Sequence, residues 1–326
     1  MRTSPEKLAR EAQATGFRPD VLEKVARLLD LLNALQSHPF LRGKLVLKGG
    51  TALNLFVFDV PRLSVDIDLN HVGAGERDDM LAERPKIEQA VQAVFTREGF
   101  TVRRVPEEHA GGKWRLHYES SSGGGGNLEV DINFMYRVPL WPVAVRSSHP
   151  VGAWQAVAIP VLDIHELAAG KLAALLARGK ARDLFDSRQI FRMDTLDPRT
   201  LRLAFVVYGA MNRRDWRTVS ADDVGFDPAE LARQLVPTLR ADASGTPTQT
   251  TEYGEGLVRE CREGLSRVLP FTENEREFLD RLLDQGTIHP ALLTADEALQ
   301  QRIQCQPLLQ WKALNVRRHK LGEERG

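Results

Sequence analysis

The segment of residues 44–70 constrains the fold more than any other part of the chain. Residues 45–47 are a short apolar run, which is typical of a buried strand. Residues 52–58 carry an apolar pattern at helical spacing, and residues 63–69 alternate apolar with polar side chains as a half-buried strand does. This order of strand, helix and strand predicts a mixed α/β fold.

The turn before the expected helix consists of Lys48, Gly49, Gly50 and Thr51. Two residues without Cβ let a phosphate approach the backbone, and a helix N-terminus offers unpaired N–H groups to it. A Gly-Gly pair alone is more often an ordinary turn. Its place between a buried strand and a helix predicts that these four residues bind the phosphates of a nucleotide.

The alternating strand places Ser64, Asp66 and Asp68 on one face, with successive residues of that face about 7 Å apart. Two carboxylates this close repel each other unless a cation lies between them. Mg²⁺ with a substrate triphosphate is the usual occupant of such a pair. An isolated Asp-x-Asp is mostly a solvated strand face, but together with the glycine turn it predicts a site for an NTP and Mg²⁺.

A second acidic strand is expected over residues 128–135, after a hairpin partner over 113–119. Glu129 and Asp131 share its polar face, so either could supply a third carboxylate, and both could instead be surface acids on an edge strand. The Ser/Gly run between the two strands opens no helix, so we interpret it as a hairpin tip rather than a phosphate loop. A helix is expected over 87–98, after a loop over 71–84.

The spacing of Gly49-Gly50 and Asp66-Ile67-Asp68 resembles the signature of the nucleotidyltransferase superfamily. The strings KGGTALNLF and RLSVDIDL are similar to the AbiEii/AbiGii toxins, a MenT-like branch of bacterial toxin–antitoxin systems. The resemblance implies Asp66 and Asp68 as metal ligands and Asp131 as the third catalytic carboxylate. It also implies transfer of a nucleoside monophosphate to RNA, with the tRNA 3′ end as the leading acceptor, an antitoxin encoded nearby, and a part in phage defence.

Residues 161–192 form the next informative segment, a helical pattern that carries Arg-x-x-x-Arg-Asp-x-x-Asp. The resemblance extends to this motif and implies that Lys171 is catalytic and neutralises triphosphate charge, which suits its compact ammonium. Arg182 would touch phosphate or form an ion pair, and an aspartate would orient Lys171, a water molecule or the acceptor. The alternative is a structural Arg–Asp clasp between lobes. The supporting residues on these interpretations are Arg62, Arg178, Asp183 and Asp186.

The length of 326 residues predicts two lobes. The resemblance implies that residues 1–160 form an α/β nucleotidyltransferase-fold lobe with a small mixed sheet. We expect residues 161–326 to form a helical lobe that closes a cleft over it. Lys+Arg and Asp+Glu both number 44, so RNA binding would need a local basic face. Arg178, Arg182 and residues 317–320 are the expected phosphate contacts.

Two cysteines are too few for a disulfide framework or a zinc site. The N-terminus lacks the apolar core of a signal peptide and no 18-residue apolar span occurs, so we expect a cytoplasmic protein without a membrane partner. Two other functions stay open: a nucleotidyltransferase that modifies a protein or a small molecule, and a catalytically silent relative that binds nucleic acid or protein.

Overall fold

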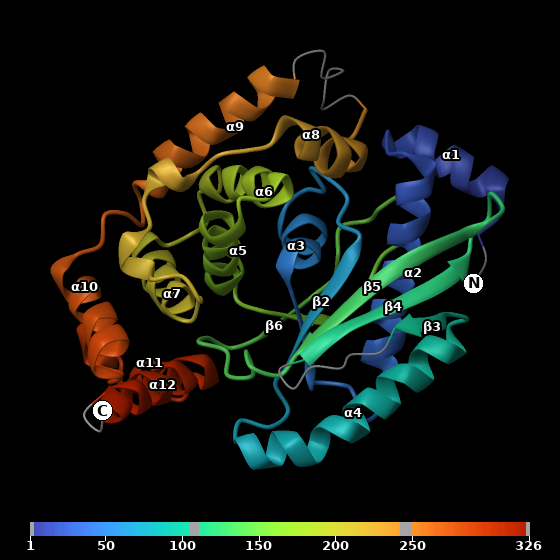
Figure 1. Cartoon of the computed structure of the whole chain (residues 1–326). Coiled ribbons are helices and arrows are strands. Elements are labelled where there is room, and N and C mark those ends of the chain that lie inside the picture. The colour runs from blue at the N-terminus through green and yellow to red at the C-terminus, as the bar shows by residue number, and fades with distance from the viewer. Residues whose placement is uncertain (1–2, 105–110, 242–249, 324–326) are drawn as a thin grey trace. The chain divides into compact units, whose positions relative to one another are not determined.

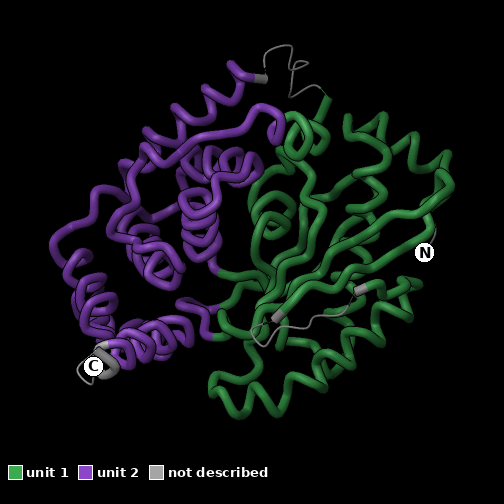
Figure 2. The backbone as a smooth tube through the Cα atoms, in the orientation of Figure 1, with its two compact units in different colours: residues 1–137, 143–162, 232–248 green, residues 138–142, 163–231, 249–326 purple. Residues whose placement is uncertain are grey.

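The chain divides into two compact units in a computed structural model that describes residues 3–104, 111–241 and 250–323. Unit 1 comprises residues 1–137, 143–162 and 232–248, and unit 2 comprises residues 138–142, 163–231 and 249–326 (Figure 2). The main division after residue 162 lies close to the expected one at 160. Residues 138–142 belong to unit 2, although the residues on both sides of them belong to unit 1. Residues 232–248 belong to unit 1, although the residues on both sides of them belong to unit 2.

Unit 1 is built on a seven-stranded mixed sheet with the order β3-β4-β5-β2-β1-β7-β6 (Figure 1). The pairs β2–β5 and β1–β7 run parallel, and the other neighbours run antiparallel. The mixed α/β fold is therefore confirmed. The strands are β1 Leu45–Lys48, β2 Asp66–His71, β3 Thr101–Arg104, β4 Gly111–Glu119, β5 Gly125–Asn133, β6 Ala144–Arg146 and β7 Ile159–Val161.

One face of the sheet is apolar and lies against helices. Helix α2 contacts β5, α4 contacts β3, and Phe95 of α4 meets Trp114 of β4 edge to face at 6.0 Å. Ile67, Val130 and Ile132 are fully buried on this side, which leaves the polar positions of β2 and β5 on the other face. The helices of unit 1 are α1 Pro5–Thr15, α2 Pro19–Ser37, α3 Gly49–Ala52 with the π-helical turn η1 Leu53–Val57, α4 Arg77–Arg97 and the turn η5 Val236–Thr238.

Two predicted elements of unit 1 have different limits. Strand β2 begins at Asp66, not at Leu63, because the Leu63 N–H donates to the Thr238 carbonyl instead of a sheet neighbour. The predicted loop over 71–84 is wrong for most of its length, since β2 continues to His71 and α4 already begins at Arg77. Acidic residues in the first turn of α4 and a buried Met80 stabilise this earlier start.

Unit 2 is helical in its described part. Gly179 ends α5 in the left-handed conformation, so Lys171 and Arg178 lie on α5 and Arg182 lies on α6. Among the described residues, no helix combines the length and the apolar character needed to cross a bilayer. The helices are α5 Ile164–Arg178, α6 Ala181–Phe191, α7 Pro198–Ala210, α8 Pro228–Glu230, α9 Thr250–Leu265, α10 Glu273–Asp280, α11 Glu297–Gln304 and α12 Pro307–Glu323, with turns η2 Trp216–Thr218, η3 Ala221–Asp223, η6 Arg281–Gln285 and η7 Pro290–Leu292. The turn η4 Leu231–Leu235 begins at the last residue before the 232–248 segment of unit 1.

Candidate active site

Strands β2 and β5 bring four carboxylates onto one face of the sheet. Their parallel register pairs Asp66 with Glu129 and Asp68 with Asp131. Paired residues of neighbouring strands point to the same face, and the strands are about 4.8 Å apart. All four side chains are half-buried. The structure therefore assembles the predicted acids of both strands in one place, within unit 1.

Two lysines flank these acids on the same face. Lys48 of β1 pairs with Asp68, and Lys113 of β4 pairs with Asp131, so a row of Lys48, Asp68, Asp131 and Lys113 crosses four adjacent strands; we call it the charged row. Burial lowers the pKa of Lys48 below its ordinary value, although the charges of Asp68 and Asp131 act in the opposite direction. A cation half-withdrawn from water beside two carboxylates is suited to meet an incoming anion.

Glu129 and Asp131 differ in their partners. Glu129 Oε2 accepts from Lys113 Nζ at 3.1 Å. Burial acts to raise the pKa of Glu129, but this hydrogen bond and the lysine charge outweigh it and the pKa is lowered. Burial likewise acts to lower the pKa of Lys113, while Glu129, Asp66 and Asp68 together raise it. Glu129 is thus engaged by a cation, and Asp131 is the direct neighbour of Asp68.

Sequence reasoning did not single out Lys113. The signal was present, because Lys113 and Asp131 both stand on alternating strands that flank one hairpin tip. The pairing depends on the exact turn position: the observed register of Glu119 with Gly125 places Lys113 opposite Asp131, whereas the expected strand limits of 119 and 128 would not.

The glycine turn lies directly against β2. Gly49 has φ +72°, and a Cβ on it would overlap Asp68 Oδ2 and stand 3.1 Å from Asp68 Cβ. Thr51 Oγ1 donates to the Asp66 carbonyl, and Asn54 Nδ2 donates to the Gly50 carbonyl at 2.9 Å. The helix start and the acidic strand are therefore held in contact, and only glycine fits at position 49.

Arg62 and Ser64 precede β2 and are buried, with exposed fractions of 1% and 5%. Arg62 forms an isolated bridge with Leu239, and its Nη1 donates to the Leu63 carbonyl at 2.9 Å. Ser64 lies before the strand, which begins at Asp66, and not within the strand as expected. Arg62 fixes the backbone that leads into the acidic strand.

The remaining predicted residues lie in unit 2, and four of them form an ion-pair group in which all but the exposed Arg178 are buried. Lys171 Nζ lies 2.9 Å from Asp183 Oδ1 and 3.0 Å from Asp186 Oδ2, and Arg178 Nε lies 2.6 Å from Asp183 Oδ2. We call these four residues the Lys171 cluster. It links α5 with α6, and its two cations balance its two anions. The neighbouring cations hold the pKa of Asp183 well below its usual range, although burial acts against them. Arg182, half-buried, follows at the start of α6.

Glu166 is a buried acid of unit 2 that the sequence analysis did not single out. Its carboxylate accepts from the backbone N–H groups of Leu140 and Trp141 at 3.0 and 3.2 Å, and from the Tyr208 hydroxyl at 3.0 Å. Burial raises the pKa of Glu166 to about 7, against the effect of these hydrogen bonds. Asp163 is the N-cap of α5.

The charged row has the donor chemistry that Mg²⁺ requires, namely carboxylate oxygens on a rigid sheet. No three His, Cys, Asp or Glu side chains of the described segments are gathered closely enough to enclose a metal ion by themselves. Mg²⁺ seldom needs such a cage, because it is normally held by one or two carboxylates together with substrate phosphates and water. Asp68 and Asp131, side by side in register, fit that mode of binding.

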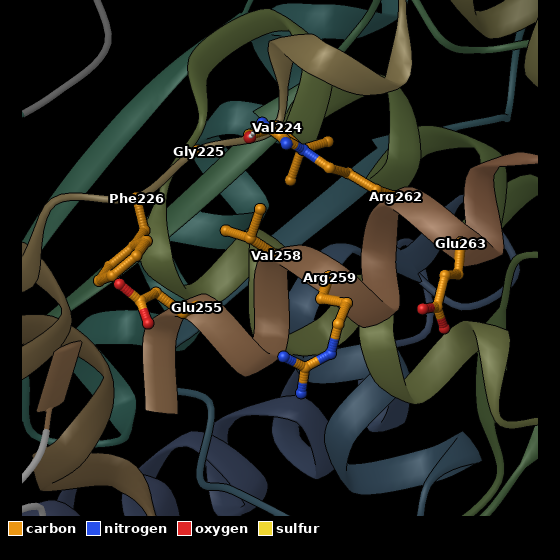
Figure 3. A pocket seen from close by; sticks show the side chains of 8 residues that line it. All are labelled: Val224, Gly225, Phe226, Glu255, Val258, Arg259, Arg262 and Glu263. Carbon is orange, nitrogen blue, oxygen red and sulfur yellow. Dashed lines mark hydrogen bonds between the residues drawn. The ribbon is translucent and has the colours of Figure 1, made fainter. Parts of the chain in front are cut away.

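A separate hollow of about 530 Å³ lies in unit 2 between α9 and residues 224–226 (Figure 3). Val224, Phe226 and Val258 provide apolar surface, while Arg262 reaches the Val224 carbonyl at 3.0 Å. The charges at its rim belong to two arginines and two glutamates, so they favour neither anions nor cations. None of the predicted site residues lines it.

The comparisons with known proteins agree with this geometry. A family model described as the nucleotidyltransferase AbiEii toxin of type IV toxin–antitoxin systems matches residues 30–285. Among solved structures, the chain is similar to MenT4, a nucleotidyltransferase toxin from Mycobacterium tuberculosis, with a TM-score of 0.60 and 19% identity over 95% of this chain and 97% of that one. No curated protein matches.

Proposed function

Because the chain belongs to the AbiEii family, the nucleotidyltransferase toxins of type IV toxin–antitoxin systems, we propose that it transfers a nucleoside monophosphate from an NTP to RNA. The family implies an NTP substrate and a cognate antitoxin. The tRNA 3′ end is the acceptor we propose, since a modified end would block aminoacylation and hence translation. The observation that supports the proposal is the register of β2 with β5, which unites the acids of two strands beside the glycine turn.

The acids of β2 and β5 divide the chemical work. Asp66 and Asp68 on β2, with Asp131 on β5, would hold Mg²⁺, which supplies neutralisation of the charge on the transferring phosphate. Asp131 would orient the RNA hydroxyl and accept its proton. We prefer it to Glu129, because Glu129 is already engaged by Lys113 at 3.1 Å.

The turn would bind the β- and γ-phosphates. Gly49 and Gly50 leave room for phosphate at the backbone, Thr51 fixes the turn to β2, and Lys48 brings a positive charge beside Asp68. The hydroxyl oxygen then bonds to the α-phosphorus, the bond to the bridging oxygen breaks, and pyrophosphate leaves. Most of the acceleration would come from positioning and charge neutralisation.

The family resemblance implies a catalytic role for Lys171, but we propose a structural role for it first. Its ammonium lies between two carboxylates and is only 8% exposed, so we assign it first to the stability of unit 2. A direct contact with phosphate would require the ammonium to exchange a carboxylate for that phosphate. Arg182 remains the proposed phosphate contact from unit 2, with Ser64 proposed near the nucleotide in unit 1.

The test is incubation of the purified protein with Mg²⁺, total tRNA and each α-³²P-labelled NTP in turn, with Asp68→Asn as the matched control. The proposal predicts label on tRNA with the wild type, none with Asp68→Asn, and none after chelation of Mg²⁺. Label on protein or on a small molecule, with tRNA unlabelled, would replace the acceptor. No label on any acceptor would favour a silent binding protein.

A further inference from the structure

The C-terminal helix α12 exposes an aromatic side chain that packing does not explain. Trp311 is 56% exposed and Leu314, one turn later, is 38% exposed, whereas the other four tryptophans are buried or half-buried. Residues three apart on a helix lie next to each other, so the two form one apolar surface. An exposed tryptophan beside an exposed leucine indicates a contact surface.

The described part of the same helix carries basic side chains. Its described side chains, residues 307–319, include Lys312, Arg317, Arg318 and His319 and no carboxylate. Arg318 stands seven residues after Trp311, two turns along the same face. The side chain of Lys320, predicted to belong to this basic group, lies outside the described residues. A cationic face with an aromatic centre suits a polyanion.

Two anchors fix this face within unit 2. Lys312 Nζ donates to the Asn212 carbonyl, and Arg317 Nη1 donates to the Gly286 carbonyl at 2.6 Å. A Cβ on Gly286 would lie 2.5 Å from the Ala313 carbonyl oxygen, so the helix is closely packed there. Trp311 and Arg318 are thereby presented by a helix that is held in place.

A hollow of about 380 Å³ adjoins the exposed face. Ile288, Ala313 and Leu314 supply apolar surface, and Gln304 and Gln310 supply amide groups that can hydrogen-bond to the edges of a base. Leu314 belongs both to the hollow and to the exposed apolar pair.

We propose that α12 binds a single-stranded segment of the RNA acceptor, with one base stacked on Trp311, a neighbouring base in the hollow and a phosphate at Arg318. Stacking on an exposed aromatic side chain beside basic residues is how proteins hold single strands. The proposal rests on RNA as the acceptor. A protein partner such as the antitoxin would also use the apolar pair, but the basic side chains of residues 307–319, with no carboxylate among them, favour the nucleic acid.

The test separates binding from transfer. Binding of a fluorescein-labelled single-stranded RNA is measured by anisotropy for the full chain and for Trp311→Ala, Trp311→Phe and Arg318→Ala. Arg199→Ala, which removes an exposed arginine elsewhere in unit 2, is the matched control. Label transfer to tRNA is measured in parallel for every variant.

Loss of one stacked base raises Kd about 5- to 150-fold in Trp311→Ala, and Trp311→Phe restores most of the affinity. Arg318→Ala lowers the salt dependence of binding by about 0.7 in log–log slope. In tRNA transfer the variants raise KM and leave kcat unchanged. Transfer by the wild type with unchanged RNA binding in the α12 variants would overturn this inference and leave the proposed function intact.

Two other results would also test the proposed binding of RNA to α12. Absence of both transfer and RNA binding in the wild type would refute RNA as the acceptor, and the α12 inference with it. Loss of neutralisation by the cognate antitoxin in Trp311→Ala, with RNA binding unchanged, would assign the surface to a protein partner.

Discussion

Substitution of Gly49 by alanine tests the contact between the turn and the acidic strand. Gly49 has φ +72°, and an L-residue held there costs about 1–2 kcal/mol. The new Cβ would overlap Asp68 Oδ2, so the carboxylate has to rotate away, at a further cost of about 0.5–1.5 kcal/mol. We expect the free energy of unfolding to fall by about 2–3 kcal/mol. The rate of nucleotidyl transfer should fall about 100-fold, because the displaced carboxylate no longer meets the substrate.

Gly43→Ala is the matched control. Gly43 has φ +77°, and a Cβ added to it would have no neighbouring atom within 4 Å, so it carries the same backbone cost without touching Asp68. Urea unfolding measures the stability of both variants, and initial rates of label transfer measure their activity. Gly43→Ala should keep wild-type activity. If Gly49→Ala transferred label as fast as Gly43→Ala, the proposed link between the turn and Asp68 would be refuted.

Two further predictions concern unit 2. Lys171→Ala leaves two buried carboxylates with one cation fewer, so it should lower the free energy of unfolding by about 3–5 kcal/mol in urea titrations. Lys180→Ala, which breaks only the exposed contact with Glu230 at 3.6 Å, should cost less than about 1 kcal/mol, and equal losses would contradict a structural role for the Lys171 cluster. Because burial raises the pKa of Glu166 from 4.5 to about 7, the folded state keeps a proton that the unfolded chain releases in this range. The free energy of unfolding should therefore fall as the pH rises from about 4.5 to about 7, and this group contributes at most about 3 kcal/mol of that fall. Glu166→Gln should flatten this pH dependence. The control Glu263→Gln, at an exposed position, should leave it unchanged. Parallel slopes for both variants in pH-dependent urea unfolding would refute the assignment.

The acidic centre could be predicted from sequence because its determinants are local. Period-two alternation determines which residues of β2 and β5 share a face, and a glycine pair between a strand and a helix has few other uses. The parallel register that joins Asp68 to Asp131 is not local, since it depends on how two strands far apart in the chain align. It could be anticipated only through the family resemblance.

The errors also have physical causes. The start of β2 depends on a hydrogen bond from Leu63 to Thr238, a residue far along the chain that no local pattern reveals. Exposure of Trp311 could not be predicted either, because tryptophan is usually buried and the helix around it has no clear apolar face.

The most direct measurement compares Asp131→Asn with Glu129→Gln in label transfer from NTP to tRNA. Both variants remove one negative charge from neighbouring positions of the same strand face. If Asp131 receives the proton of the attacking hydroxyl, Asp131→Asn should lower kcat about 10²- to 10⁴-fold. Glu129→Gln loses only a half-exposed ion pair with Lys113 and should stay within about tenfold of wild type. Equal losses, or a larger loss in Glu129→Gln, would contradict the assignment of the charged row as the catalytic centre.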